Sequence, residues 1–185
     1  LRMGFHDDSF AHSTLGDIDW FFWPGMISAG ADERWHEVPI GGELRPELQT
    51  EVFDDAYVLG TYAQDVAICV ETTHASYLLN YWAYNGDGTG YLGEERVRAE
   101  RVARDMGYEF TLTGGSVVLS GLAADGVDGV VSLELAATGV APFYYALTPV
   151  LVDQATGTAI SSAGPLLTVL PGDSVTVDFS LSRVP

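Results

Sequence analysis

The sequence predicts two parts of different class: an α/β part with parallel strands over residues 1–112, and an antiparallel β-sandwich over residues 113–185. In the first part, apolar runs alternate with helical patterns, a rhythm typical of parallel sheets. In the second, short alternating runs are separated by turn residues. A third observation bears on function: acids or a histidine stand at or just after strand-like runs, within residues 4–8, 39–43 and 72–77.

Four apolar runs predict strands in the first part, over residues 1–5, 35–40, 66–70 and 108–112. Helices are predicted over residues 47–57, where Pro46 suits the first turn, over 77–84 and over 94–106. The last helix is the clearest, because Glu94 and Glu100 each precede an arginine by four residues. That acid-first order favours ion pairs along a helix.

Six strands are predicted in the second part, over residues 116–122, 129–137, 143–153, 157–162, 166–169 and 174–182. The last has the plainest alternation, with apolar side chains at Val175, Val177, Phe179 and Leu181. Strands of this length and spacing indicate a sandwich.

The charge balance excludes some classes of function. The chain has 26 acidic residues and 8 basic ones, all arginine, for a net charge of −18. Such a surface repels phosphate backbones and anionic membranes, so nucleic-acid binding is not expected. No apolar run approaches the ~20 residues of a membrane span. Cys69 is the only cysteine, which excludes an internal disulfide and predicts a buried thiol.

The order of short motifs resembles one bacterial family, known as domain of unknown function 4832. The matching pieces are residues 4–8, 39–43, 73–80 and 107–110, and residues 137–144 resemble the element that opens the family's sandwich. That element has an asparagine where this chain has Ala137 or Thr138. The resemblance extends in order over nearly the whole chain.

The resemblance implies a glycoside-hydrolase-like protein with a TIM barrel followed by a β-sandwich. This chain would supply the C-terminal half of the (β/α) barrel and most of the sandwich. Because the first residues already read as a strand, we expect a piece whose N-terminal half is absent. The missing half and a carbohydrate are the expected partners, and an extracellular or cell-surface location is implied although the chain contains no signal peptide.

Two carboxyl groups flanking the scissile bond are the usual requirement of glycoside hydrolysis. Glu43 is the leading candidate, because it follows a strand and two glycines where side chains reach a barrel mouth. Asp8 is the second candidate, although the partner of Glu43 can also lie in the absent half. Asp7 and Asp8 are adjacent, so an extended strand points them to opposite faces. Asp7 is predicted to bind substrate if it faces the barrel mouth, and otherwise to support a loop or cap a helix.

Sugar binding is predicted for four further residues. His74 can bond a hydroxyl or orient a carboxylate. Trp23 and Tyr84 can stack on sugar rings, and Asn80 ends the third resembling motif. No metal or cofactor is predicted: the four histidines lack ligand spacing, and residues 85–91 fail the calcium-loop pattern and read as a turn.

Two other interpretations stay open. The protein can be a non-catalytic carbohydrate-binding, adhesion or spacer module. Alternatively, residues 1–112 can be a small α/β domain that closes on itself. Open strand edges in the first part would argue against that second alternative.

Overall fold

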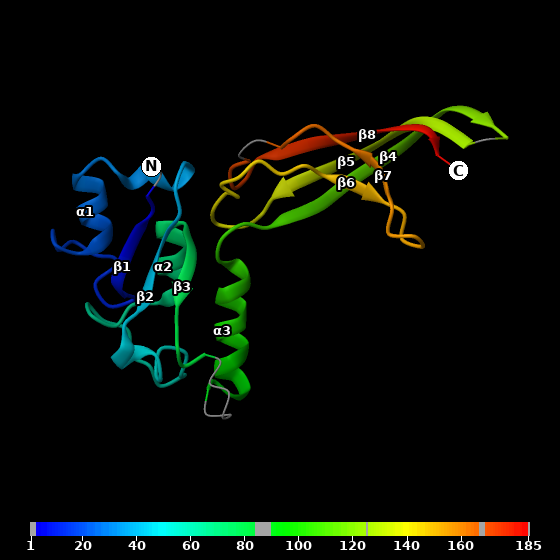
Figure 1. The fold of residues 1–185 in the computed structure, drawn as a ribbon. Coiled ribbons are helices and arrows are strands. Elements are labelled where there is room, and N and C mark those ends of the chain that lie inside the picture. The colour runs from blue at the N-terminus through cyan, green and yellow to red at the C-terminus, as the bar shows by residue number, and fades with distance from the viewer. Residues whose placement is uncertain (1–2, 84–89, 125, 167–168, 185) are drawn as a thin grey trace. The chain divides into compact units, whose positions relative to one another are not determined.

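The computed structural model describes residues 3–83, 90–124, 126–166 and 169–184 (Figure 1). The fold is mixed α/β: a small parallel sheet with helices, followed by antiparallel sheets. The chain divides into two compact units. The first unit comprises Leu1–Tyr108 and Gly139–Pro142, and the second comprises Glu109–Thr138 and Phe143–Pro185.

The first unit contains a three-stranded sheet in the order β1 (Phe5–Phe10), β2 (Ile40–Leu44), β3 (Ala75–Leu79). Both pairings are parallel, so the three strands end at the same edge of the sheet. Within the described residues, β1 and β3 each pair on one side only, and no closed barrel is seen. The sheet therefore has two open edges.

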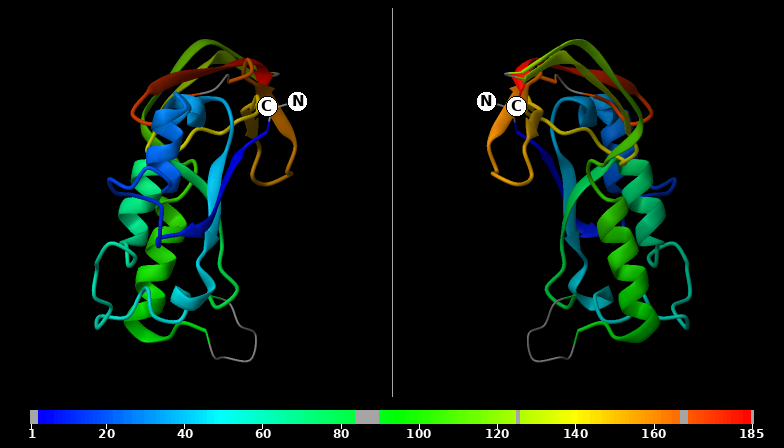
Figure 2. Two further views of the ribbon diagram at one scale, coloured as in Figure 1. Left: turned by 90° about the vertical axis from the view of Figure 1, so that its left-hand side faces the viewer. Right: turned by 90° about the vertical axis from the view of Figure 1, so that its right-hand side faces the viewer.

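Helices cover one face of this sheet (Figure 2). They are α1 (Phe22–Ser28), α2 (Val66–Thr73) and α3 (Gly93–Asp105). Two short 3₁₀ turns, η1 (Asp32–His36) and η2 (Pro46–Leu48), lie before and after β2. The core beneath them is apolar and includes Phe10, Leu44, Val70 and Val102. Among the described residues, no helix is long and apolar enough to cross a membrane.

Two predictions in the middle of this unit were wrong. Residues 66–70, predicted as a strand, form the start of α2, because Asp65 caps it by accepting bonds from Ala67 N and Ile68 N at 2.8 and 3.1 Å. The buried residues of α2 are spaced as a helix requires, at Val66, Cys69, Val70 and Thr73. The sequence alone did not distinguish this helical spacing, because a short apolar run with β-branched residues fits a buried strand equally well.

The predicted helix over residues 77–84 is also wrong in its described part. Helix α2 ends at His74, which adopts a left-handed φ of 54°, and β3 begins at the next residue. Residues 47–57 form no long helix either, only η2 and turns. The predicted strand over 35–40 begins only at Ile40, since η1 occupies residues 32–36.

Other predictions are confirmed. Helix α3 matches the predicted segment, and the predicted Glu100–Arg104 pair forms at 3.5 Å. Arg98, predicted to pair with Glu94, instead pairs with Asp55 at 2.8 Å. Gly107 has a φ of 79°, the left-handed conformation typical just beyond a helix end.

The second unit is built on a long antiparallel sheet in the order β4–β5–β8, formed by β4 (Phe110–Ala123), β5 (Gly126–Ala137) and β8 (Ser174–Val184). The alternation predicted for β8 is present, with Val177 and Phe179 both buried. A smaller hairpin joins β6 (Val150–Val152) to β7 (Ala159–Ser162). The strand predicted over 143–153 is therefore much shorter, and strand β4 pairs antiparallel rather than continuing a parallel sheet.

Candidate carboxylate site on the open sheet face

The parallel sheet of the first unit has two unlike faces. Alternation along β2 sends Ile40, Gly42 and Leu44 toward the helices, where all three are buried. Gly41 and Glu43 face the other way. On this second face, called the open face below, Leu79 is 59% exposed. Parallel sheets are normally covered on both faces, so an exposed face of this kind is unusual.

Asp7 points to the helix side and is buried. Its carboxylate accepts a bond from Thr14 Oγ1 at 2.7 Å and another from Ser9 N at 3.0 Å. Burial raises the pKa of Asp7, while the bonds from Thr14 and Ser9 act in the opposite direction. Asp7 therefore holds the loop after β1 rather than facing the open side.

Asp8 and Glu43 share the open face. Asp8 is exposed and Glu43 half-buried. The register between β1 and β2 steps from Asp7 opposite Gly42 to Phe10 opposite Leu44, so Asp8 and Ser9 lie opposite Glu43. The two acids thus come from neighbouring parallel strands near their carboxyl ends. Neighbouring strands are about 4.8 Å apart.

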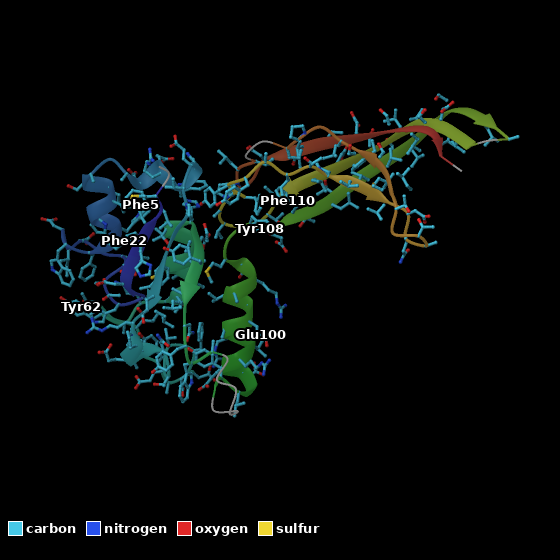
Figure 3. All side chains as sticks on the ribbon, viewed as in Figure 1. Phe5, Phe22, Tyr62, Glu100, Tyr108 and Phe110 are labelled. Carbon is cyan, nitrogen blue, oxygen red and sulfur yellow. The ribbon has the colours of Figure 1, made fainter. Side chains whose placement is uncertain are left out.

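Two ring side chains on the same face, His6 and Tyr77, were not assigned to the site by the sequence analysis. The ring of Tyr77 on β3 lies over Gly41, and its hydroxyl donates to Phe5 O at 3.1 Å. The same hydroxyl is 3.3 Å from His6 Nδ1, and the two rings stack with centroids 6.0 Å apart. Figure 3 labels Phe5 at the start of β1. Tyr77 thus links β1 to β3 across β2.

This contact fixes the tautomer of neutral His6. A carbonyl oxygen only accepts, so the Tyr77 hydroxyl proton goes to Phe5 O, and His6 Nδ1 must donate to the hydroxyl oxygen. In the neutral ring, Nε2 is then an acceptor. The sequence contained one signal that could have placed His6 at the site: His6 and Asp8 are two residues apart on one strand, so they share a face.

Asn80 follows β3 at the carboxyl edge of the sheet but is occupied by structural bonds. Its Oδ1 accepts from Trp82 N and Ala83 N at 3.1 and 3.2 Å, and its Nδ2 donates to Tyr91 Oη at 3.2 Å. Tyr91 in turn donates to Gln49 O. These bonds shape the loop after β3.

His74 lies at the opposite end of the sheet from Asp8 and Glu43. It follows α2 and precedes β3, whereas the sequence analysis had it follow a strand and precede a helix. Its Nδ1 donates to Val140 O at 2.7 Å, and its ring stacks on Trp35 with centroids 3.6 Å apart. Burial lowers the pKa of His74. The structure therefore gives His74 structural partners and separates it from the two acids.

Of the two predicted aromatic residues, Trp23 is not brought together with the acids. Trp23 lies half-buried on α1, which belongs to the helix-covered side. Tyr84 and most of the predicted 85–91 turn lie outside the described residues. No group of three or more metal-ligating side chains occurs within the part of the chain that the structure describes.

The open face therefore offers two carboxyl groups, an imidazole nitrogen and an aromatic ring on a parallel-sheet scaffold of mixed α/β class. Comparison with protein families, curated proteins and solved structures gave no match to this chain.

Proposed function

We propose that this chain is a carbohydrate-active protein resembling a glycoside hydrolase, in which Asp8 and Glu43 are the two catalytic carboxyl groups. The proposal includes membership of the domain of unknown function 4832 family, action on an extracellular polysaccharide or oligosaccharide, and an extracellular or cell-surface location. The observation that carries it is the shared position of Asp8 and Glu43 on the open face of adjacent parallel strands.

The finer architecture belongs to the same proposal. The three parallel strands are part of a (β/α) barrel whose interior is the open face, and the second unit is a β-sandwich. Two observations support this architecture: the helices lie on one face only, and the sheet has two open edges. In a closed barrel, further strands would pair with those edges and enclose the open face. The partner in this arrangement is a further barrel segment of the same protein.

In the proposed mechanism, one carboxyl group protonates the leaving oxygen while the other attacks the anomeric carbon or activates water. Carboxyl groups about 5–5.5 Å apart act with retention, and those about 6.5–9.5 Å apart with inversion. The separation of the Asp8 and Glu43 carboxyl groups around the bound sugar therefore decides between the two outcomes. His6 Nε2 and the Tyr77 ring lie on the same face and would contact the sugar bound there.

The test measures turnover of a panel of soluble polysaccharides by the protein that the full reading frame encodes, and by its Asp8→Asn and Glu43→Gln variants. Each substitution is expected to lower turnover by at least about 100-fold with binding retained, because removal of one member of an acid–base pair typically costs about 10²–10⁴. Glu71→Gln, on an exposed position of α2, is the matched control and should leave turnover unchanged.

A second function, non-catalytic carbohydrate binding, is favoured by the exposed aromatic side chains Trp20 and Tyr62. Under this alternative no turnover would be found on any glycan, and binding would be unaffected by Glu43→Gln. That pair of results would replace the hydrolase proposal.

A further inference from the structure

Two large aromatic side chains lie exposed beside each other in the loops that follow β1 and β2. Trp20 is 65% exposed and Tyr62 is 46% exposed. Their ring centroids are 6.4 Å apart and their planes differ by 24°. Figure 3 labels Tyr62 in the loop before α2. Isolated exposed rings are common, but two exposed rings this close together make a larger apolar patch.

Buried and polar neighbours hold the pair in place. Phe21 is 1% exposed and contacts both rings, with centroids 4.7 Å from Trp20 and 5.6 Å from Tyr62. On the other side, the His12 ring lies 5.0 Å from Tyr62. Because the supporting groups are packed, the two exposed rings lose little freedom when a ligand binds.

Hydrogen-bonding groups border the rings. Arg45 Nη1 is 3.1 Å from His12 Nδ1, and Arg45 Nε is 3.1 Å from Glu47 Oε2. A guanidinium only donates, so His12 Nδ1 accepts, the imidazole is neutral, and Nε2 carries the ring proton. Both burial and the Arg45 charge lower the pKa of His12, in agreement with this tautomer. A donor at His12 therefore adjoins the Tyr62 ring, while Glu47 lies beyond Arg45.

The chain connects this surface to the two acids. His12 stands four residues after Asp8 and Arg45 two residues after Glu43, and the Arg45–His12 contact joins the ends of β1 and β2. A hollow of ≈ 370 Å³ lined by Val52, Tyr57 and Arg98 shares none of these residues. Another hollow, of ≈ 570 Å³, is lined by Phe21, Thr61 and Ala63 but by neither Trp20 nor Tyr62, so the exposed rings lie outside it.

We infer that Trp20 and Tyr62 form a stacking platform for a pyranose ring of a glycan chain, with His12 donating to one of its hydroxyl groups. The apolar face of a pyranose fits an aromatic ring, and its hydroxyl groups accept a hydrogen bond from a donor such as His12 Nε2. The inference rests on the proposed function for its ligand class, but it concerns binding and not the reacting bond.

The experiment measures binding of the 185-residue chain to cellohexaose, xylohexaose, mannohexaose and chitohexaose by calorimetry. Trp20→Ala and Tyr62→Ala are each expected to weaken the tightest of these by about tenfold or more, a loss of ~1.4 kcal/mol. Trp20→Phe, which keeps a stacking ring, should retain most of the affinity. Tyr145→Ala is the matched control, since Tyr145 is 77% exposed in the second unit, and it should bind as the original chain does. Circular dichroism confirms that each variant is folded.

Two results would overturn the platform: binding to none of the four hexasaccharides, or binding that Trp20→Ala and Tyr62→Ala leave unchanged. Failure of the platform is distinguishable from failure of the proposed function. The platform fails on affinity alone, whereas the hydrolase proposal fails on the turnover of Asp8→Asn and Glu43→Gln.

Discussion

The ring of Tyr77 lies directly over Gly41, so that a Cβ atom added to this glycine would come within 2.6 Å of ring Cδ1 and 2.7 Å of Cε1. Real Cβ atoms do not approach so closely, and the backbone oxygen of Tyr77 would be closer still. Gly41 is therefore required by the packing of β3 against β2, not by a turn. Its absent side chain is what lets Tyr77 reach His6.

Gly41→Ala is expected to destabilise the first unit by about 1–3 kcal/mol, the usual cost of forcing extra volume into a packed position. Chemical denaturation followed by tryptophan fluorescence measures the change. Gly60→Ala is the control, because nothing lies within 4 Å of a Cβ at that position. Equal stability of the two variants would contradict the packing argument.

Gln49 is expected to be the most sensitive polar residue in the loops after β2 and β3. It is fully buried, its Nε2 donates to Leu44 O at 2.6 Å, and its Oε1 accepts from Tyr81 N at 3.0 Å. Gln49→Leu leaves these backbone groups without partners and should cost about 2–4 kcal/mol in unfolding free energy. Gln154→Leu, at an exposed position, should change it by less than about 0.5 kcal/mol. A loss below that level for Gln49→Leu would show that water replaces the side chain.

His74 should make stability depend on pH in the acid range. Because burial lowers its pKa in the folded state, the neutral ring stabilises the fold fully above the ordinary value of 6.5. This contribution is lost as pH falls through the lowered pKa, where the folded chain must bind a proton that the unfolded chain binds more readily. We expect the difference in unfolding free energy between the original chain and His74→Asn to shrink between pH 7.5 and pH 4.5. Asparagine is the chosen replacement because it tolerates the left-handed φ of 54°. A difference that stays constant would contradict the shift.

Cys69 should be unreactive in the folded chain. Its side chain is fully buried, and burial raises the pKa of the thiol to about 12. Thiolate is the reactive form, so a disulfide reagent at pH 8 should label Cys69 only as fast as the chain unfolds. Stopped-flow labelling with and without denaturant tests this. Rapid labelling without denaturant would show that α2 opens locally.

Local patterns were sufficient for some elements and not for others. Helix α3 and strand β8 were predictable because ion-pair spacing and alternation are properties of one continuous segment. The segment 66–70 was not, since an apolar β-branched run fits either a buried strand or a buried helix. What decides it is the cap at Asp65 and the packing of α2 on the sheet.

By itself, the sequence determined that Asp7 and Asp8 face opposite ways, because alternation is set by the geometry of any extended strand. It also determined the acidic surface and the absence of an internal disulfide. Only the tertiary structure decided that Asp8 lies opposite Glu43, that Tyr77 crosses Gly41, and that His74 lies at the far end of the sheet. Those relationships join residues that are far apart in the chain. They depend on which strands pair and in which register. Alternation within one strand fixes the face that each side chain takes, but not the residue of the neighbouring strand that it meets.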